Sequence, residues 1–164
     1  MKRALVWFGL ALGLALVAYA VFARKTDEEL IQERLARLGR SIGVATGENP
    51  ITRAARLNRD FSDLFTQEAS VSIPELSGPI RGRRELAALA TRAAAGFHNL
   101  DVAFTGTIID LGNAGADVRT TATLSGVRSD SDIDEGTRHV SLRFAHTDGD
   151  WLIDSVSVSS EGNR

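Results

Sequence analysis

The most constraining feature of this 164-residue sequence is a change of hydrophobic period near His98. Before this residue, apolar side chains recur every three or four positions, and after it they alternate with polar ones. The first pattern predicts amphipathic helices, and the second predicts half-buried strands of an antiparallel sheet. We therefore expect an α+β domain in which helices precede a sheet.

Three segments carry the helical pattern. Thr26 and Glu29 have the spacing of a capping box at the start of the first helix. The second helix is expected to begin at the asparagine–proline pair 49–50, and the third is expected over residues 83–95. The inner face of the third helix is predicted to carry Leu86, Leu89, Ala90 and Ala93.

Four long strands are expected after His98, with hairpin turns at residues 112–115 and 148–150. A short strand over residues 69–73 is expected between the second and third helices. The inward positions of the two middle strands are Val118, Thr120, Ala122, Val140, Leu142 and Phe144. Since these side chains are almost all apolar, they suit core packing or an apolar ligand better than catalysis.

The order of these elements, together with the segments PIRGRREL (79–86) and DGDWLIDSVSV (148–158), resembles the nuclear transport factor 2-like superfamily. This superfamily includes SnoaL-like proteins and ketosteroid isomerases, and the resemblance covers residues 27–160. It implies a cone-shaped α+β fold, a cystatin-like roll in which a curved antiparallel sheet packs on three N-terminal helices. It also implies an apolar pocket between sheet and helices.

Residues 4–23 form a run of 20 residues without a charge, long enough to cross a bilayer as a helix. We predict an uncleaved single-pass anchor in a bacterial inner membrane, with the soluble domain on the periplasmic or extracellular side. The alternative is a signal peptide cleaved after Ala20, which would give a secreted protein. The expected division is residues 1–25 as anchor or signal and residues 26–164 as the domain.

The charge of the soluble part argues against nucleic-acid binding. It holds 15 arginines against all 21 acidic residues, a net charge of −6, which gives no broad attraction for phosphate backbones. The sequence has no cysteine, so disulfides, thiolate zinc sites and cysteine nucleophiles are excluded. We predict no cofactor and no metal.

The stretch SDSDIDEG (129–136) places carboxylates on alternate residues, as a calcium loop does. The pattern then fails, because Glu135 stands where the loop needs glycine and Ser141 stands where it needs a bidentate glutamate. Serine and aspartate are also common in solvated turns. We predict the tip of a hairpin.

Acid–base candidates are few. His98 with Asp101, or His146 with Asp154, could act as acid and base if the fold joins them. The isomerases that the fold resembles use an aspartate facing a tyrosine that stabilises an oxyanion. Since the only tyrosine here, Tyr19, lies in the uncharged N-terminal run, half of that machinery is absent.

The large side chains of the soluble part are expected to fill or line the cone. As pocket-lining residues we name Phe61, Phe65, Phe97, Val118, Leu142, Phe144 and Trp151. A short basic cluster, Arg81, Arg83 and Arg84, lies at the start of the third helix. We interpret it as solvated surface; the alternative is a site for an anion or an acidic partner.

We predict a membrane-anchored, noncatalytic ligand-binding or protein-assembly module; the alternative is a SnoaL-like enzyme, of isomerase, cyclase or dehydratase type, acting on a small hydrophobic molecule. The expected partners are the membrane, through residues 4–23, an apolar small molecule or an envelope protein, and a second copy of the chain. The copy would pair through the outer sheet face, which carries Arg119, Thr121, Thr123, Ser141 and Arg143. An open pocket with convergent polar groups would favour the enzyme, and a filled cone would favour the assembly module.

Overall fold

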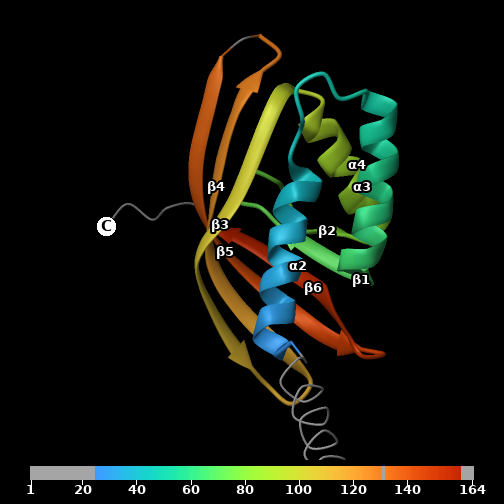
Figure 1. Cartoon of the computed structure of the whole chain (residues 1–164), viewed down its shortest axis with the longest axis vertical. Coiled ribbons are helices and arrows are strands. Elements are labelled where there is room, and N and C mark those ends of the chain that lie inside the picture. The colour runs from blue at the N-terminus through green and yellow to red at the C-terminus, as the bar shows by residue number, and fades with distance from the viewer. Residues whose placement is uncertain (1–24, 131, 160–164) are drawn as a thin grey trace, which may run out of the picture.

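The computed structural model describes residues 25–130 and 132–159. These residues form three helices and six strands (Figure 1), in the order α2 (Asp27–Ile42), α3 (Pro50–Leu64), β1 (Phe65–Ser72), β2 (Ile80–Arg81), α4 (Arg83–Ala94), β3 (Phe97–Leu111), β4 (Gly115–Arg128), β5 (Ile133–Thr147) and β6 (Asp150–Ser159). The predicted anchor or signal segment lies outside the described residues. None of the described helices is long and apolar enough to cross a membrane.

The three helices begin where the sequence predicts. The capping box is formed, because the Glu29 backbone N–H donates to Thr26 Oγ1 and the Thr26 N–H donates to Glu29 Oε2, at 3.2 and 2.8 Å. The Asn49 side chain caps α3 by accepting a 2.8 Å hydrogen bond from the Ile51 N–H. Local capping signals thus fix both helix starts.

The six strands form one sheet in the order β2-β1-β6-β5-β4-β3. The hairpin-linked strands β3 to β6 are antiparallel, as predicted. The expectation of an entirely antiparallel sheet is corrected at one place, where β1 runs parallel to β6. A hairpin forces its two strands to be antiparallel, but β1 and β6 are separated by a helix and four strands, so their direction is not constrained in this way.

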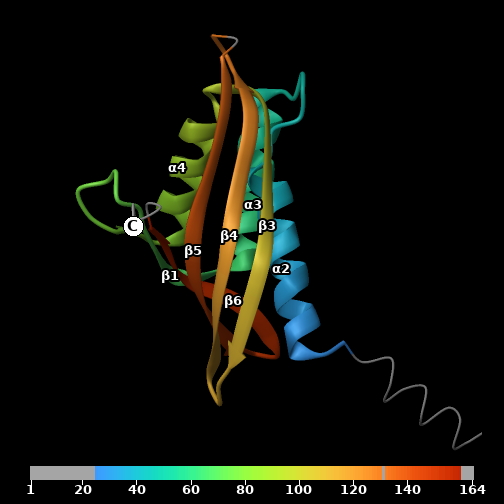
Figure 2. The same ribbon diagram turned by 90° about the vertical axis from the view of Figure 1, so that its left-hand side faces the viewer.

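The first strand is also longer than the predicted segment 69–73, and the two-residue strand β2 was not predicted. Strand β2 pairs antiparallel with β1, where Ser70 lies opposite Arg81. Together they extend the sheet beyond β6, toward α4 (Figures 1 and 2).

The helices cover one face of the sheet (Figure 2), and the sheet curves around them (Figure 1). Register irregularities mark bulges in the strands, among them one between Thr105 and Ile108 in β3 and one at Asp154 in β6, which lies opposite the consecutive residues Arg143 and Phe144 of β5. In β3 the bulge contains Gly106, whose φ of +61° is favourable for glycine. Bulges increase the bend and twist of a strand, which explains how the sheet forms one wall of a hollow.

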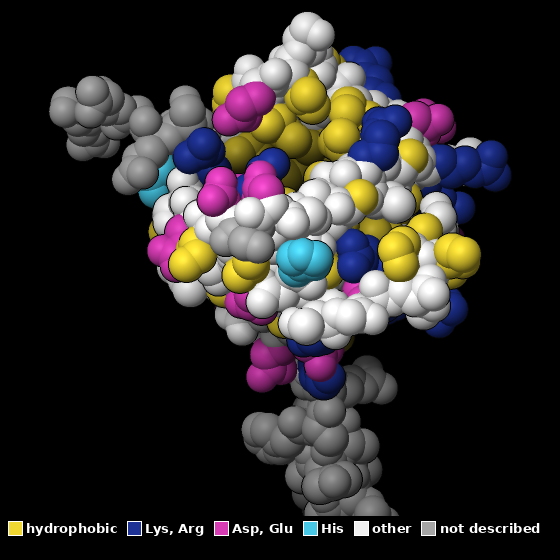
Figure 3. All heavy atoms as spheres, turned by 90° about the horizontal axis from the view of Figure 1, so that it is seen from above, with side chains coloured by type: hydrophobic (Ala, Val, Ile, Leu, Met, Phe, Trp, Pro, Cys, Tyr) yellow, Lys and Arg dark blue, Asp and Glu magenta, His cyan; other side chains and the backbone are white. Residues whose placement is uncertain are grey.

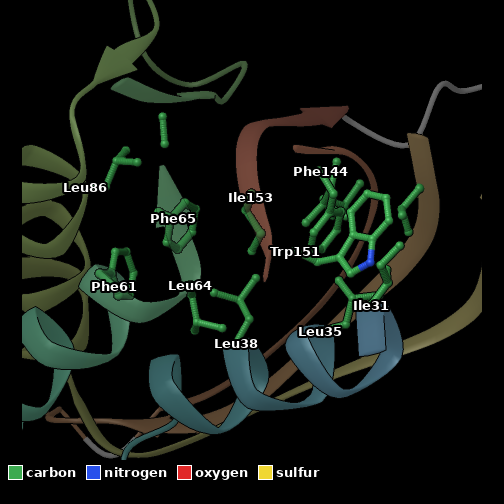
Figure 4. Close-up of a cluster of buried hydrophobic side chains, with 14 of the residues drawn as sticks. Ile31, Leu35, Leu38, Phe61, Leu64, Phe65, Leu86, Phe144, Trp151 and Ile153 are labelled. Atoms are coloured by element: carbon green, nitrogen blue, oxygen red, sulfur yellow. The ribbon is translucent and has the colours of Figure 1, made fainter. Parts of the chain in front are cut away.

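The hydrophobic core lies between α2, α3 and the sheet (Figure 4). Ile31 and Leu57 from the helices and Phe144 and Ile153 from the sheet are fully buried. The predicted inward positions Val118, Val140 and Leu142 are buried as well. The core therefore follows the two hydrophobic periods of the sequence.

Candidate functional site

A cavity of about 470 Å³ lies between the helices and the inner face of the sheet. Its lining comes from all three helices and from every strand except β2, and it is hydrophobic apart from Asp134, Gly136 and Arg138. Figure 3 shows the hollow, lined by hydrophobic side chains with acidic and basic side chains at its rim. The opening lies at the end of the molecule that carries the β4–β5 hairpin tip (Figure 1).

Small residues on α4 and β4 keep this space open. The predicted inner face of α4 lines the cavity with all four of its residues, Leu86, Leu89, Ala90 and Ala93, and two of them are alanines. Ala122 faces them from β4. Because protein interiors are otherwise close-packed, short side chains at these positions leave a volume that larger residues would fill.

One wall is aromatic. Phe61 at the end of α3 and Phe65 at the start of β1 are stacked, with ring centroids 4.8 Å apart. Both are buried in the described structure, at 5% and 3% exposure. Such a wall offers a flat apolar surface to a ligand.

Strand β5 contributes a graded row of inward-facing residues. Starting at the hairpin end, this row reads Asp134, Gly136, Arg138, Val140 and Leu142. The charged side chains therefore stand near the mouth, and the deeper positions are aliphatic. Asp134 lies 3.7 Å from Arg128, and Arg138 lies 3.6 Å from Glu75; all four side chains are at least two-fifths exposed.

The interior offers no free polar group among the described residues. Thr120 is buried in the sheet, but its hydroxyl donates to the Thr105 carbonyl at 2.9 Å and lies 3.0 Å from the Thr107 hydroxyl. Within residues 25–130 and 132–159, every buried side-chain nitrogen or oxygen has a hydrogen-bond partner. The cavity can therefore desolvate an apolar body but presents no buried acid, base or nucleophile to it.

The predicted pocket-lining residues separate into three groups. Phe61, Phe65 and Leu142 line the cavity. Val118, Phe144 and Trp151 lie in the packed core (Figure 4 shows Phe144 and Trp151 apart from Phe61 and Phe65).

The seventh residue, Phe97, packs in a second small cluster with Leu100, outside the cavity. The Arg128 guanidinium lies over its ring, 5.8 Å from the centroid.

The acid–base candidates do not meet. No hydrogen bond or ion pair in the described structure joins His98 to Asp101 or His146 to Asp154, and none of the four lines the cavity. The His146 ring is exposed and packs 4.8 Å from the Trp151 ring, and Asp154 accepts a 3.1 Å hydrogen bond from the Thr66 hydroxyl.

The described residues 129, 130 and 132 of the acidic stretch lie at the hairpin tip between β4 and β5, as predicted. The Arg128 N–H donates to the Asp132 carbonyl at 2.8 Å, and Asp134 to Gly136 already belong to β5. Across the described ranges, no three His, Asp or Glu side chains are grouped so that they could hold a metal ion.

The basic cluster at the start of α4 lines a separate, polar hollow. Arg81, Arg83 and Arg84 share it with Glu68 and Glu85, so its charges are mixed. The mouth residues Asp134, Gly136 and Arg138 were not predicted from the sequence. Their alternation with outward-facing residues of β5 could have indicated that they face inward.

A comparison with protein families matches residues 54–157 to the SnoaL-like domain. The chain belongs to the SnoaL-like family. This confirms the superfamily resemblance read from the sequence, and the matched range spans α4, most of α3 and the sheet except the last two residues of β6. No curated protein matches this SnoaL-like chain in sequence.

Solved structures share the fold of this SnoaL-like protein. An NTF2-like superfamily protein from Salmonella enterica matches with a TM-score of 0.66 at 20% identity, over 81% of this chain and 89% of that one. An NTF2-like protein with a cystatin-like fold from Novosphingobium aromaticivorans matches with a TM-score of 0.64 at 17% identity, over 94% and 90%. Aln2 from Streptomyces matches with a TM-score of 0.65 at 14% identity, over 84% and 94%. The TM-scores show that these structures share the fold of this chain.

Proposed function

We propose that this SnoaL-like domain is a noncatalytic module that binds a small apolar molecule. The observation that carries the proposal is the cavity of about 470 Å³, whose lining is hydrophobic except at the mouth. Its volume lies within the range of known small-molecule sites, roughly 300–1,000 Å³. Because the cone is hollow rather than filled, ligand binding explains the domain better than assembly alone.

The lining also argues for binding without chemistry. A general acid or base must reach the reacting group within hydrogen-bond distance, directly or through one water. The histidines of the described chain lie outside the cavity lining, and its only ionisable members are Asp134 and Arg138. The enzyme alternative would therefore require one of these two rim residues to act on the ligand.

The proposal includes a membrane tether through residues 4–23. Its support is the run of 20 uncharged residues, which has the length of a bilayer-spanning helix. We expect the full chain to stay with the membrane pellet after an alkaline carbonate wash and a chain lacking residues 2–24 to be released. Release of the full chain would contradict the tether and leave the binding proposal intact.

Ligand binding is tested by titrating the protein with the uncharged fluorescent probe N-phenyl-1-naphthylamine. Ala90 lines the cavity from α4, whereas Ala88, on the same helix, is exposed and outside it. We expect saturable fluorescence enhancement for the wild type and for Ala88→Phe, and at least a tenfold weaker affinity for Ala90→Phe, because the new ring occupies the cavity.

Thermal unfolding of both variants shows whether each remains folded. Equal probe binding by folded Ala90→Phe and Ala88→Phe, or no saturable binding by the wild type, would contradict the proposed function.

A further inference from the structure

We propose that the ligand is an anionic amphiphile, with an apolar body inside the cavity and a carboxylate at the Arg138 guanidinium. This inference rests on the proposed function, because it names the chemical class of molecule that the same cavity accepts. It is drawn from the charge gradient along β5 and from the state of the two charged residues at the mouth.

The cavity has one apolar end and one charged end. Arg138 and Leu142, the lining residue of β5 farthest from the hairpin tip, are four positions apart, which corresponds to about 13 Å along an extended strand. A volume of 470 Å³ accommodates on the order of 15 non-hydrogen atoms, if each takes about the 30 Å³ of a water molecule. A molecule of this size that places its apolar body inside has its polar end at the mouth, where Arg138 and Asp134 are the charged lining residues.

Arg138 has donors to spare for such a group. In the described structure its Nη1 donates to the neighbouring Thr137 carbonyl at 3.2 Å, and its Nη2 lies 3.6 Å from Glu75. An ion pair of that length between half-exposed side chains is weak and easily exchanged. A guanidinium carries five N–H donors in a planar fork that matches a carboxylate in a bidentate arrangement.

Asp134, the other charged residue of the lining, opposes an anion only weakly. Its carboxylate lies 3.7 Å from Arg128, which is also 3.7 Å from Asp130, so this guanidinium offsets part of the Asp134 charge. Arg138 is four residues farther along the strand, a separation of about 13 Å that exceeds the Debye length of roughly 8 Å at physiological ionic strength. Gly136, between them, leaves open space, since a β-carbon built there meets no atom within 4 Å.

The test compares three ligands with the same ten-carbon chain: decanoate, 1-decanol and decylammonium. Each displaces N-phenyl-1-naphthylamine from the wild type, from Arg138→Gln and from the control Arg143→Gln. Arg143 is on the same strand as Arg138, but it is exposed and lies outside the cavity lining.

We expect the wild type to bind decanoate about five- to tenfold more tightly than decanol at low salt, as a charge-assisted bond at a half-exposed site predicts. Arg138→Gln should abolish this preference by weakening decanoate binding more than decanol binding, and Arg143→Gln should retain it. The preference should also shrink in 1 M salt.

Equal binding of decanoate and decanol by the wild type would overturn the inference, as would a preference that survives Arg138→Gln or tightest binding of decylammonium. If the probe binds but none of the three ligands displaces it, the inference fails while the apolar binding site stands. If the probe itself does not bind, the proposed function fails as well.

Discussion

The indole Nε1 of Trp151 on β6 donates a 3.0 Å hydrogen bond to Asp27 Oδ1 in the first turn of α2. Trp151 is only 5% exposed, so its N–H has little access to water. We expect Asp27→Ala to lower the free energy of unfolding by about 1–3 kcal/mol, because the buried donor loses its partner. Asp27→Asn keeps an acceptor oxygen and should lose clearly less. Urea unfolding of the two variants measures the difference, and equal losses would contradict this role for the hydrogen bond.

Arg53 holds the α2–α3 connection against the end of α4. It is buried at 7% exposure and donates to the Ala94 carbonyl at 2.8 Å and to Glu48 at 3.2 Å. Arg53→Met should lower the free energy of unfolding by about 3 kcal/mol, because it leaves the Ala94 carbonyl and much of the Glu48 charge without their partner. Chemical denaturation checks this value, with the exposed Arg92→Met as control. A loss below about 1 kcal/mol would show that Arg56, which also pairs with Glu48, is sufficient.

Gly39 brings α2 against β3. A β-carbon at this position would lie 2.5 Å from the Val102 carbonyl oxygen. A glycine-to-alanine change inside a helix ordinarily stabilises it by up to about 1 kcal/mol, but here we expect a loss of about 1–3 kcal/mol, because the helix must move off the strand. The melting temperature of Gly39→Ala shows whether the substitution stabilises or destabilises the protein. Arg40→Ala, at the exposed neighbouring position, should leave it nearly unchanged; a stabilised Gly39→Ala would contradict the close approach.

Glu33 gives a prediction on pH. The hydrogen bond and charge of Lys25 lower the pKa of Glu33 below its ordinary value of 4.5. A lowered folded-state pKa means that the ion pair stabilises the fold above the ordinary pKa and that this contribution fades as the pH falls through the folded-state pKa. Lys25→Gln should raise the pKa of Glu33 toward 4.5, and Lys25→Arg should keep it low. Nuclear magnetic resonance titration of the Glu33 carboxyl carbon reads out both; an unchanged pKa in Lys25→Gln would contradict the pairing.

The parts of the fold that depend on local interactions could be predicted from the sequence. Capping residues such as Thr26 and Asn49 act within one helical turn, so the helix starts could be predicted from a few neighbouring residues. Alternation in β4 and β5 likewise predicted which side chains face inward. The parallel pairing of β1 with β6 could not be predicted this way, because it joins residues about 85 positions apart.

The cavity shows a second limit of sequence reasoning. Leu142 and Phe144 are both inward-facing on β5, yet one lines the cavity and the other is fully buried in the core. Periodicity gives the face of a strand but not the point along it where packing closes, which depends on the small residues opposite, such as Ala90 and Ala122. Arg138, a charged residue on an inward row, was the available sign of an opening.

Crystallography under xenon pressure tests the central claim most directly, because xenon occupies preformed apolar cavities and is located by its strong scattering. We predict a xenon site among Phe61, Ala90 and Leu142 in the wild type that is lost in Ala90→Phe. A wild-type structure in which these side chains close the space, or in which ordered water fills it in place of xenon, would contradict the account.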